Sequence, residues 1–244
     1  MLEVCVESVA GIGAAVAGGA DRIELCAALA VGGLTPPLSL IRQAASAPIA
    51  THLLARPRDG NFRYGAGDAA LVAQDITTAA EAGLAGVVIG ASDASGRLDA
   101  DMLAGWVAHA RAAGQARGRP LSLTLHRAFD LCPDLFEALE TAVHLGFDRI
   151  LTSGGQPRAA DALDTLAALV ARADGRIIIL PGSGIDTSNV AAILRTGAQE
   201  VHASCRSPLG EASEAEQRFG FQNGAALQTD PAKVSALKAM VRRA

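Results

Sequence analysis

The feature that most constrains the fold of this chain is a strict alternation of short β-rich runs with helical stretches rich in Ala and Leu. Eight runs have the length and composition of strands: Leu2–Ser8, Asp21–Cys26, Ile49–Arg56, Gly86–Gly90, Leu121–Arg127, Arg149–Ser153, Ile177–Pro181 and Glu200–Cys205. Apolar residues at helical spacing predict eight helices: Val9–Gly18, Leu38–Ala45, Gly67–Ala82, Ala100–Ala113, Pro133–Leu145, Ala159–Ala173, Ser188–Thr196 and Pro231–Arg243. Each strand is followed by one helix, which favours a parallel sheet.

Eight such units are the content of a closed (β/α)₈ TIM barrel, an α/β fold that typically takes about 250 residues. The chain has 244 residues, and no linker divides it, so we expect one barrel domain over residues 1–244. A doubly wound open sheet is the alternative. The glycines expected to end helices in a left-handed conformation are Gly83, Gly114, Gly146 and Gly197. The polar segment 207–229 follows the eighth strand and should form a long loop over the barrel mouth.

Composition excludes several classes of partner. The formal net charge of −4 argues against binding through neutralised phosphates, and 3% aromatic residues leave no stacking platform for single-stranded nucleic acid. No apolar run reaches the eighteen or so residues of a membrane span, and residues 1–4 resemble a strand rather than an export signal. Four scattered cysteines do not make a disulfide framework. We therefore expect a cytoplasmic protein that binds neither nucleic acid nor membranes.

One residue count excludes a class of chemistry. Of the 21 basic residues only Lys233 and Lys238 are lysines, and both lie in the last expected helix. A Schiff-base aldolase or a pyridoxal enzyme needs a lysine in its pocket. No expected strand carries one, and no organic cofactor is indicated.

Alternate residues of a barrel strand face the lumen, and here one of the two parities is polar. The residues expected to face the lumen are Glu3, Cys5, Glu7, Arg22, Glu24, Cys26, His52, Arg56, Thr124, His126, Thr152, Glu200, His202 and Ser204. The opposite parity is mostly Val, Ile and Leu. Buried charges are costly unless they are paired, so this set predicts a polar pocket. The alternative is a purely structural ion-pair network, for instance Arg22 with Glu24 or Glu200.

Residues at the expected mouth predict anion binding. They are Gly182, Ser183 and Gly184 after the seventh strand, Ser204 at the end of the eighth, and Arg56, Arg58 and Arg127 after the third and fifth strands. Many barrels hold a phosphate or carboxylate with backbone N–H groups after strands seven and eight, and guanidinium groups suit the same oxygens. The alternative is that the Gly-Ser-Gly turn only permits close packing, while the arginines pair with Glu24, Asp130 or Glu200.

Several long motifs resemble those of the copper homeostasis protein CutC family, in the same order and spacing. They are Gly19-Ala20-Asp21-Arg22-Ile23-Glu24-Leu25-Cys26, Gly32-Gly33-Leu34-Thr35-Pro36, Arg56-Pro57-Arg58, His126-Arg127-Ala128-Phe129-Asp130, Leu151-Thr152-Ser153-Gly154 and Glu200-Val201-His202. The resemblance implies a single barrel, a cytoplasmic homodimer and a role in copper handling. Asp130, Thr152 and Ser153, which lie in these motifs, complete the candidate ligand-binding residues. The chain departs from the family pattern at Asn61 and Gln222, where amides replace charged groups.

A copper site is the first of two functional hypotheses. Cys5 and Cys26 lie on adjacent strands with matching inward parity and are the candidate metal ligands. Cu(I) is satisfied by two or three soft ligands, so these thiolates with a nearby imidazole would suffice. The alternative is that each cysteine is a small buried hydrophobic residue.

An enzyme is the second hypothesis. His126 and His202 are the candidate acid and base, and Glu24 is a candidate base or orienting carboxylate. With the arginines and the Gly182–Gly184 turn holding an anionic group, this set fits an isomerase or lyase of a small phosphorylated or carboxylated metabolite. The expected ligand is thus a copper ion or a small anionic metabolite.

Overall fold

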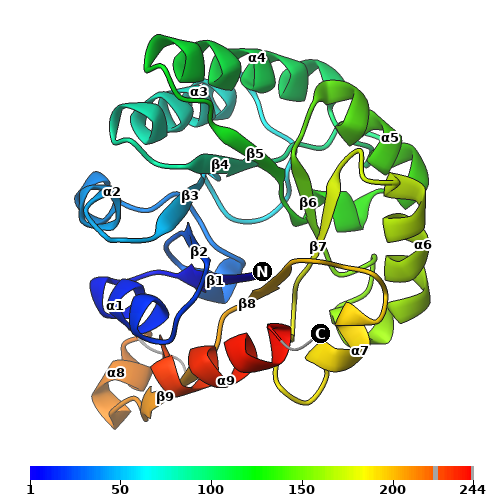
Figure 1. The fold of residues 1–244 in the computed structure, drawn as a ribbon. Coiled ribbons are helices and arrows are strands. Elements are labelled where there is room, and N and C mark those ends of the chain that lie inside the picture. Colours follow the sequence, from blue (N-terminus) through cyan, green and yellow to red (C-terminus); the bar gives the residue numbers. More distant parts are fainter. Residues whose placement is uncertain (222–224, 243–244) are drawn as a thin grey trace.

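A computed structural model describes residues 1–221 and 225–242. Its parallel strands are β1 (Leu2–Val6), β2 (Arg22–Leu25), β3 (Ala50–Leu54), β4 (Gly86–Ile89), β5 (Ser122–Leu125), β6 (Arg149–Thr152), β7 (Ile178–Pro181) and β8 (Val201–Ala203). The helices around them are α1 (Val9–Ala17), α2 (Leu38–Ala45), α3 (Ala66–Glu81), α4 (Ala100–Ala116), α5 (Leu135–Leu145), α6 (Leu163–Ala173), α7 (Val190–Leu194) and α9 (Pro231–Val241). Figure 1 shows these helices as an outer ring around the strands. Every predicted strand and helix is present.

The strand order identifies a barrel rather than a doubly wound sheet. Neighbouring strands run parallel in the order β7-β6-β5-β4-β3-β2-β1-β8, without the reversal that marks a doubly wound sheet. The sheet curls until β7 and β8 are neighbours, although no ladder of hydrogen bonds joins them within the described residues. The fold is an α/β TIM barrel with a seam between these two strands.

The apolar core lies between the strands and the helices. Strand residues such as Val4, Ile23 and Leu123 are fully buried in one cluster with Ile76 of α3 and Leu103 of α4. The side chains that alternate with them along the strands point into the lumen, and many of these are charged yet buried. The alternation of apolar and polar residues along each strand therefore places the apolar side chains against the helices and the polar side chains in the lumen.

Glycines follow several helices, as predicted, with one correction. Gly83, Gly146 and Gly197 have φ of +78°, +82° and +93°. Gly114 does not end α4, because that helix continues to Ala116 and the left-handed glycine after it is Gly118. Gly114 instead permits close packing, since a Cβ there would lie 3.0 Å from Cα of Pro120.

The segment after β8 differs from the predicted loop. Strands β9 (Arg206–Gly210) and β10 (Ala226–Thr229) pair antiparallel, with α8 (Glu214–Arg218) between them. In Figure 1, α8 and β9 lie outside the ring beside α9. No described residue of 207–229 lines the cavity at the mouth, so the predicted position over the mouth is wrong for this part of the chain. Strand pairing and packing against α1 hold the segment at the side of the barrel, and Gln222 lies outside the described residues.

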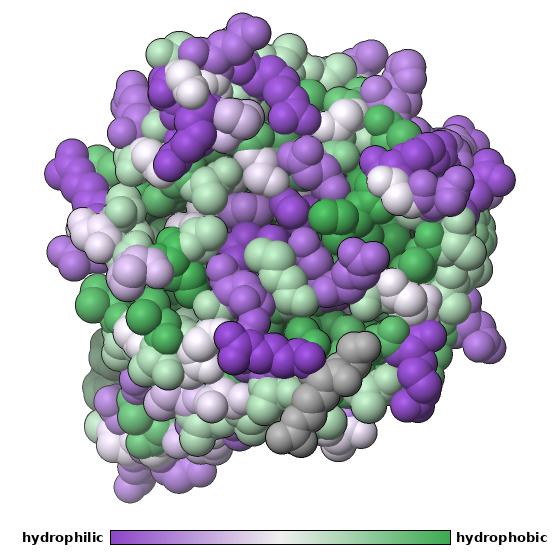
Figure 2. All heavy atoms as spheres, in the orientation of Figure 1, coloured by the Kyte–Doolittle hydropathy of each residue, from purple (hydrophilic) through white to green (hydrophobic). Residues whose placement is uncertain are grey.

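The outer surface is of mixed hydropathy. Figure 2 shows hydrophilic side chains around the rim and gathered near the centre of the face drawn. Within residues 1–221 and 225–242, no helix combines the length and the apolar character needed to cross a membrane.

Candidate functional site

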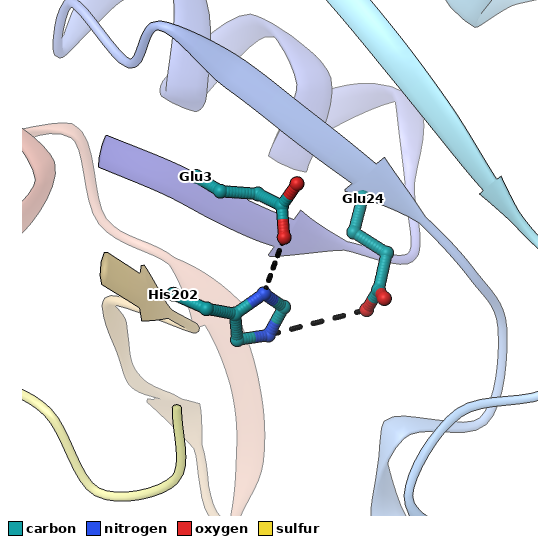
Figure 3. A group of neighbouring side chains, drawn as sticks. All are labelled: Glu3, Glu24 and His202. Carbon is teal, nitrogen blue, oxygen red and sulfur yellow. Dashed lines mark hydrogen bonds and ion pairs between the residues drawn. The ribbon is translucent and has the colours of Figure 1, made fainter. Parts of the chain in front are cut away.

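Glu3, Glu24 and His202 converge in the lumen from the three adjacent strands β1, β2 and β8 (Figure 3). The register of the ladders places Glu3 directly beside His202 on one side and Arg22 on the other. Oε1 of Glu3 lies 2.7 Å from Nδ1 of His202, and Oε2 of Glu24 lies 3.9 Å from Nε2 of the same ring. Both nitrogens of one imidazole thus face a carboxylate.

An ion-pair network lies next to this group. The guanidinium of Arg22 binds Glu3, and its second arm lies 2.7 Å from Glu200. Glu200 also lies 3.3 Å from Nε of Arg149, which comes from β6, on the far side of β7 from β8. The predicted pair of Arg22 with Glu200 is therefore present, whereas no ion pair joins Arg22 to Glu24 among the described residues. This part of the polar lumen is structural.

The electrostatic environment separates the two carboxylates facing His202. Burial would raise the pKa of Glu3, but Arg22 and His202 outweigh it and hold that pKa well below its ordinary value. Burial raises the pKa of Glu24 to about 7, helped by the charge of Glu3. Burial opposes protonation of His202, yet the Cys5 sulfur and the Glu3 carboxylate beside the ring raise its pKa well above 6.5. An ionised Glu3 thus holds an imidazolium, while Glu24 exchanges its proton near neutral pH.

A cavity of about 290 Å³ extends from Glu24 and His202 to the mouth of the barrel. Its charged and polar wall includes Glu24, Arg56, His126, Arg127, His202 and Arg206. The thiol of Cys5 and the Ser183, Gly184 and Ser204 positions also border it. The cavity therefore joins an acid–base pair to three guanidinium groups.

His126 reaches the same cavity as a neutral group. Burial and the charge of Arg56 lower the pKa of His126 to about 3. Its Nδ1 accepts a hydrogen bond from the backbone N–H of Ala128, so the ring proton is on Nε2. That Nε2 is buried and has no hydrogen-bond partner among the described residues. Gly90 makes room for the ring, since a Cβ there would lie 2.4 Å from Cε1 of His126.

The two predicted mouth arginines that line the cavity are fixed in different ways. Arg56 donates to the carbonyls of Val31, Gly33 and Gly60 at 2.7, 2.8 and 3.1 Å. It carries its charge at the cavity wall with no carboxylate partner among the described residues. Arg127 instead lies 2.7 Å from Asp130, which is the pairing that the structural alternative predicted.

Five further candidate residues do not line the cavity. They are Arg58, Asp130, Thr152, Ser153 and Gly182. Asp130 accepts hydrogen bonds from the hydroxyl groups of Thr152 and Ser153, and these three side chains satisfy one another. Arg58 turns outward to Asp68 and to the carbonyls of the 59–63 loop, one of which belongs to Asn61. Gly182 packs behind His202, where a Cβ would lie 3.4 Å from the imidazole.

The two candidate metal ligands have different surroundings. Cys5 borders the cavity and its thiol lies 3.8 Å from the carbonyl of Ala203. Cys26 is fully buried in a small apolar cluster with Leu54 and Val88, and it does not border the cavity. Burial raises the pKa of Cys26, and the nearby Cys5 raises it further.

Three residues of the site were not predicted to be catalytic, ligand-binding or metal-binding from the sequence: Glu3, Phe62 and Arg206. The parity of β1 places Glu3 in the lumen, but its partner on β8 comes from the far end of the chain. Arg206 lies two residues after Ser204, which the sequence places at the end of the eighth strand, so its position in the chain already indicated the barrel mouth. Phe62, whose ring centroid lies 4.8 Å from that of His126, belongs to a loop without any periodic pattern.

Comparisons with known proteins agree with this fold. The model of the CutC family matches residues 1–207. A protein of Sinorhizobium medicae (strain WSM419), named as a family protein CutC, is 51% identical over 241 residues, 98% of this chain and 95% of that protein. The crystal structure of a CutC protein from Streptococcus agalactiae, named for copper homeostasis, matches with a TM-score of 0.76 at 30% identity, covering 84% of this chain and 98% of that chain. Thiamine phosphate pyrophosphorylase from Pyrococcus furiosus shares the fold alone, with a TM-score of 0.58 at 15% identity over 99% of this chain and 95% of that one.

Proposed function

The chain belongs to the CutC family, and from this premise we propose that it is an isomerase or lyase that binds a small phosphorylated or carboxylated metabolite at its barrel mouth. The observation that carries the proposal is the buried carboxyl of Glu24, whose pKa burial raises to about 7 in a cavity that also holds three arginines. A carboxyl that titrates near neutral pH is suited to proton transfer, and the arginines attract an anion to it.

Glu24 and His202 are the acid–base pair of this proposal. Glu24 in its ionised form takes a proton from the substrate, and the imidazolium of His202 donates one from Nε2 to a developing oxyanion. Glu3 does not border the cavity, and it acts by holding Nδ1 of His202 at 2.7 Å. Isomerisation and lyase steps both need such a base and acid beside one another.

The mouth residues hold the anionic group of the substrate. Arg127 and Arg206 line the cavity with partly exposed guanidinium groups, while Arg56 supplies a buried, rigidly held charge. The neutral His126 offers its Nε2–H as an uncharged donor. Groups fixed before the ligand arrives stabilise charge without reorganisation.

The test is a calorimetric titration of the protein with inorganic phosphate and with a small dicarboxylate at millimolar concentration. The affinity for these anions should fall by tenfold or more in Arg127→Gln and in Arg206→Gln. The matched control is Arg58→Gln, because Arg58 lies outside the cavity and should leave the affinity unchanged. Absence of binding to the unaltered protein, or equal loss in the control, ends the proposal.

Copper binding is the second candidate function, and the name of the Streptococcus agalactiae relative motivates it. The observation in its favour is that Cys5 lies near enough to Cys26 to raise the pKa of that buried thiol. Two thiolates suit Cu(I), and the imidazole of His202 borders the same cavity as Cys5. An anaerobic Cu(I) titration of the reduced protein should then lose its binding step in Cys5→Ser/Cys26→Ser and keep it in Cys132→Ser. Unchanged Cu(I) affinity in the double variant refutes the two-cysteine site.

We also infer from the family resemblance a homodimer in the cytoplasm. All four cysteines are free thiols, which suits a reducing compartment. Light scattering of the purified protein should give twice the chain mass of 24.8 kDa. A mass of one chain at micromolar concentration contradicts the dimer.

A further inference from the structure

Glu24 is a buried carboxylate without the partners that the other lumen carboxylates have. It is 5% exposed, and among the described residues no hydrogen bond reaches its oxygens. Glu3 and Glu200, by contrast, each bind the guanidinium of Arg22. The nearest positive group to Glu24 is Nε2 of His202, 3.9 Å away. A carboxylate in this position is stabilised by a proton or by a cation.

Ligand atoms of two other residues lie close to this carboxylate. Ligand atoms of Glu3, Glu24 and His202 all lie within 4.8 Å of one another. The two oxygens of Glu3 are engaged, one by Nδ1 of His202 and the other by Arg22, which leaves Nε2 of His202 and the Glu24 oxygens toward the cavity. Cys5 is not part of that group of mutually close atoms, but its thiol borders the same cavity, and Cys5 is paired in the strand register with Glu24. One nitrogen and one carboxylate oxygen thus face the cavity close together, and one sulfur lies on the wall of the same cavity.

We propose that Cys5, Glu24 and His202 bind a divalent cation with the ligand preference of zinc, through Sγ, a carboxylate oxygen and Nε2. Zinc takes thiolate, imidazole and carboxylate ligands together, and its catalytic sites have three protein ligands and one open position. The open position here faces the cavity. Cu(I) prefers soft ligands, so a set with one thiolate beside a carboxylate favours a borderline divalent ion instead.

Glu3 is the positioning residue of this site. A metal-bound histidine commonly donates its other N–H to a carboxylate, which selects the tautomer and orients the ring. The 2.7 Å contact between Nδ1 of His202 and Glu3 has this arrangement. His126 is not a ligand of this site, because its Nε2 carries the ring proton, although the ring lines the same cavity.

The cation and the proposed acid–base reaction use the same two groups. A ligated Glu24 and a ligated Nε2 of His202 no longer carry protons, so the metal would compete with that reaction. The metal site does not rest on the reaction, since cation binding is measured without a substrate.

The experiment is a calorimetric titration of the reduced protein with Zn²⁺ at pH 7.5 in a phosphate-free buffer. One site per chain is expected, and Glu24→Gln and His202→Gln should each weaken it by more than about tenfold. The matched controls Glu211→Gln and His144→Gln alter exposed side chains and should leave the affinity unchanged. Circular dichroism verifies the folds, and Glu24→Gln imitates the protonated carboxyl and so preserves its shape. Equal affinity in the unaltered protein and both ligand variants, or no binding at all, overturns the site.

Cobalt supplies a second readout that reports the sulfur ligand. Co²⁺ in the site should show a near-ultraviolet thiolate-to-cobalt band that disappears in Cys5→Ser and persists in Cys26→Ser. A band that depends on Cys26 overturns the assignment of Cys5. The phosphate titration separates the two proposals: phosphate binding without Zn²⁺ binding removes only the metal site, and Zn²⁺ binding without phosphate binding removes only the anion-binding function.

Discussion

Nδ1 of His202 lies 2.7 Å from Oε1 of Glu3, although 199 residues separate the two along the chain. The contact joins the last barrel strand to the first, at the ladder between β8 and β1. Glu24, on the other side of β1, faces the same imidazole at 3.9 Å. Assembly of the candidate site therefore requires that the first and last strands of the barrel, β1 and β8, pair with each other.

Loss of Arg22 should destabilise the barrel strongly. In Arg22→Met, Glu3 and Glu200 lose the guanidinium that pairs with both. Leaving buried carboxylates without their partner should lower the free energy of unfolding by about 3–5 kcal/mol, measured by urea denaturation. The control Arg172→Met breaks an exposed pair with Glu140 and should cost less than about 1 kcal/mol. Equal costs would contradict a structural role for the buried network.

Replacing Glu24 should change how stability depends on pH. Burial raises the pKa of Glu24 from 4.5 to about 7, so the folded state binds this proton more tightly than the unfolded state. The resulting stabilisation is complete below pH 4.5 and is lost as the pH rises through 7. Gln cannot ionise, so Glu24→Gln should gain stability over the unaltered protein between pH 5 and pH 8, by up to about 3 kcal/mol. A difference in melting temperature that stays constant over this range contradicts the raised pKa.

His126 should remain neutral far below the ordinary pKa of histidine. Burial and Arg56 lower the pKa of His126 to about 3, and the N–H of Ala128 leaves the ring proton on Nε2. Nitrogen-15 NMR of histidine-labelled protein should show the His126 ring as a neutral Nε2–H tautomer from pH 8 to pH 5, assigned by the loss of its signals in His126→Gln; His52, whose pKa burial also lowers to about 3, keeps its own signals in that variant. A midpoint near 6.5 for this ring would show that it is not buried as described.

Gly90 should be required for the position of His126. In Gly90→Ala the new Cβ would lie 2.4 Å from Cε1 and 2.5 Å from Nδ1 of His126, so the ring must shift and its hydrogen bond from the N–H of Ala128 is disturbed. We expect a loss of about 1–3 kcal/mol in stability and weaker phosphate binding. The matched control is Gly13→Ala in α1, where a Cβ meets nothing within 4 Å and should stabilise the helix by up to about 1 kcal/mol. Two variants that behave alike would show that the contact at Gly90 is tolerated.

Much of the fold and part of the site were predictable from the sequence. The barrel follows from eight strand-and-helix units, and the polar lumen follows from the period of two along β1, β2 and β8. These patterns reside in residues a few positions apart, so they can be detected without knowledge of the fold. Glu24, His126 and His202 were selected on this basis and border one cavity.

The partners of these residues were decided only by the tertiary structure. Arg22 pairs with Glu3 and Glu200 rather than Glu24, because the ladder register and closure of the barrel bring residues 178 positions apart into contact. Cys5 reaches the cavity while Cys26 is buried beside Leu54, although both have the same parity.

The sequence by itself thus determined which side chains point inward, since parity along a strand is a local property. Depth along the barrel axis, pairing across the lumen and the unequal pKa values of Glu3 and Glu24 depend on strands that are distant in the chain. These properties are established only when β1 and β8 pair, because each depends on neighbouring side chains from distant parts of the chain. No local sequence pattern identifies those neighbours.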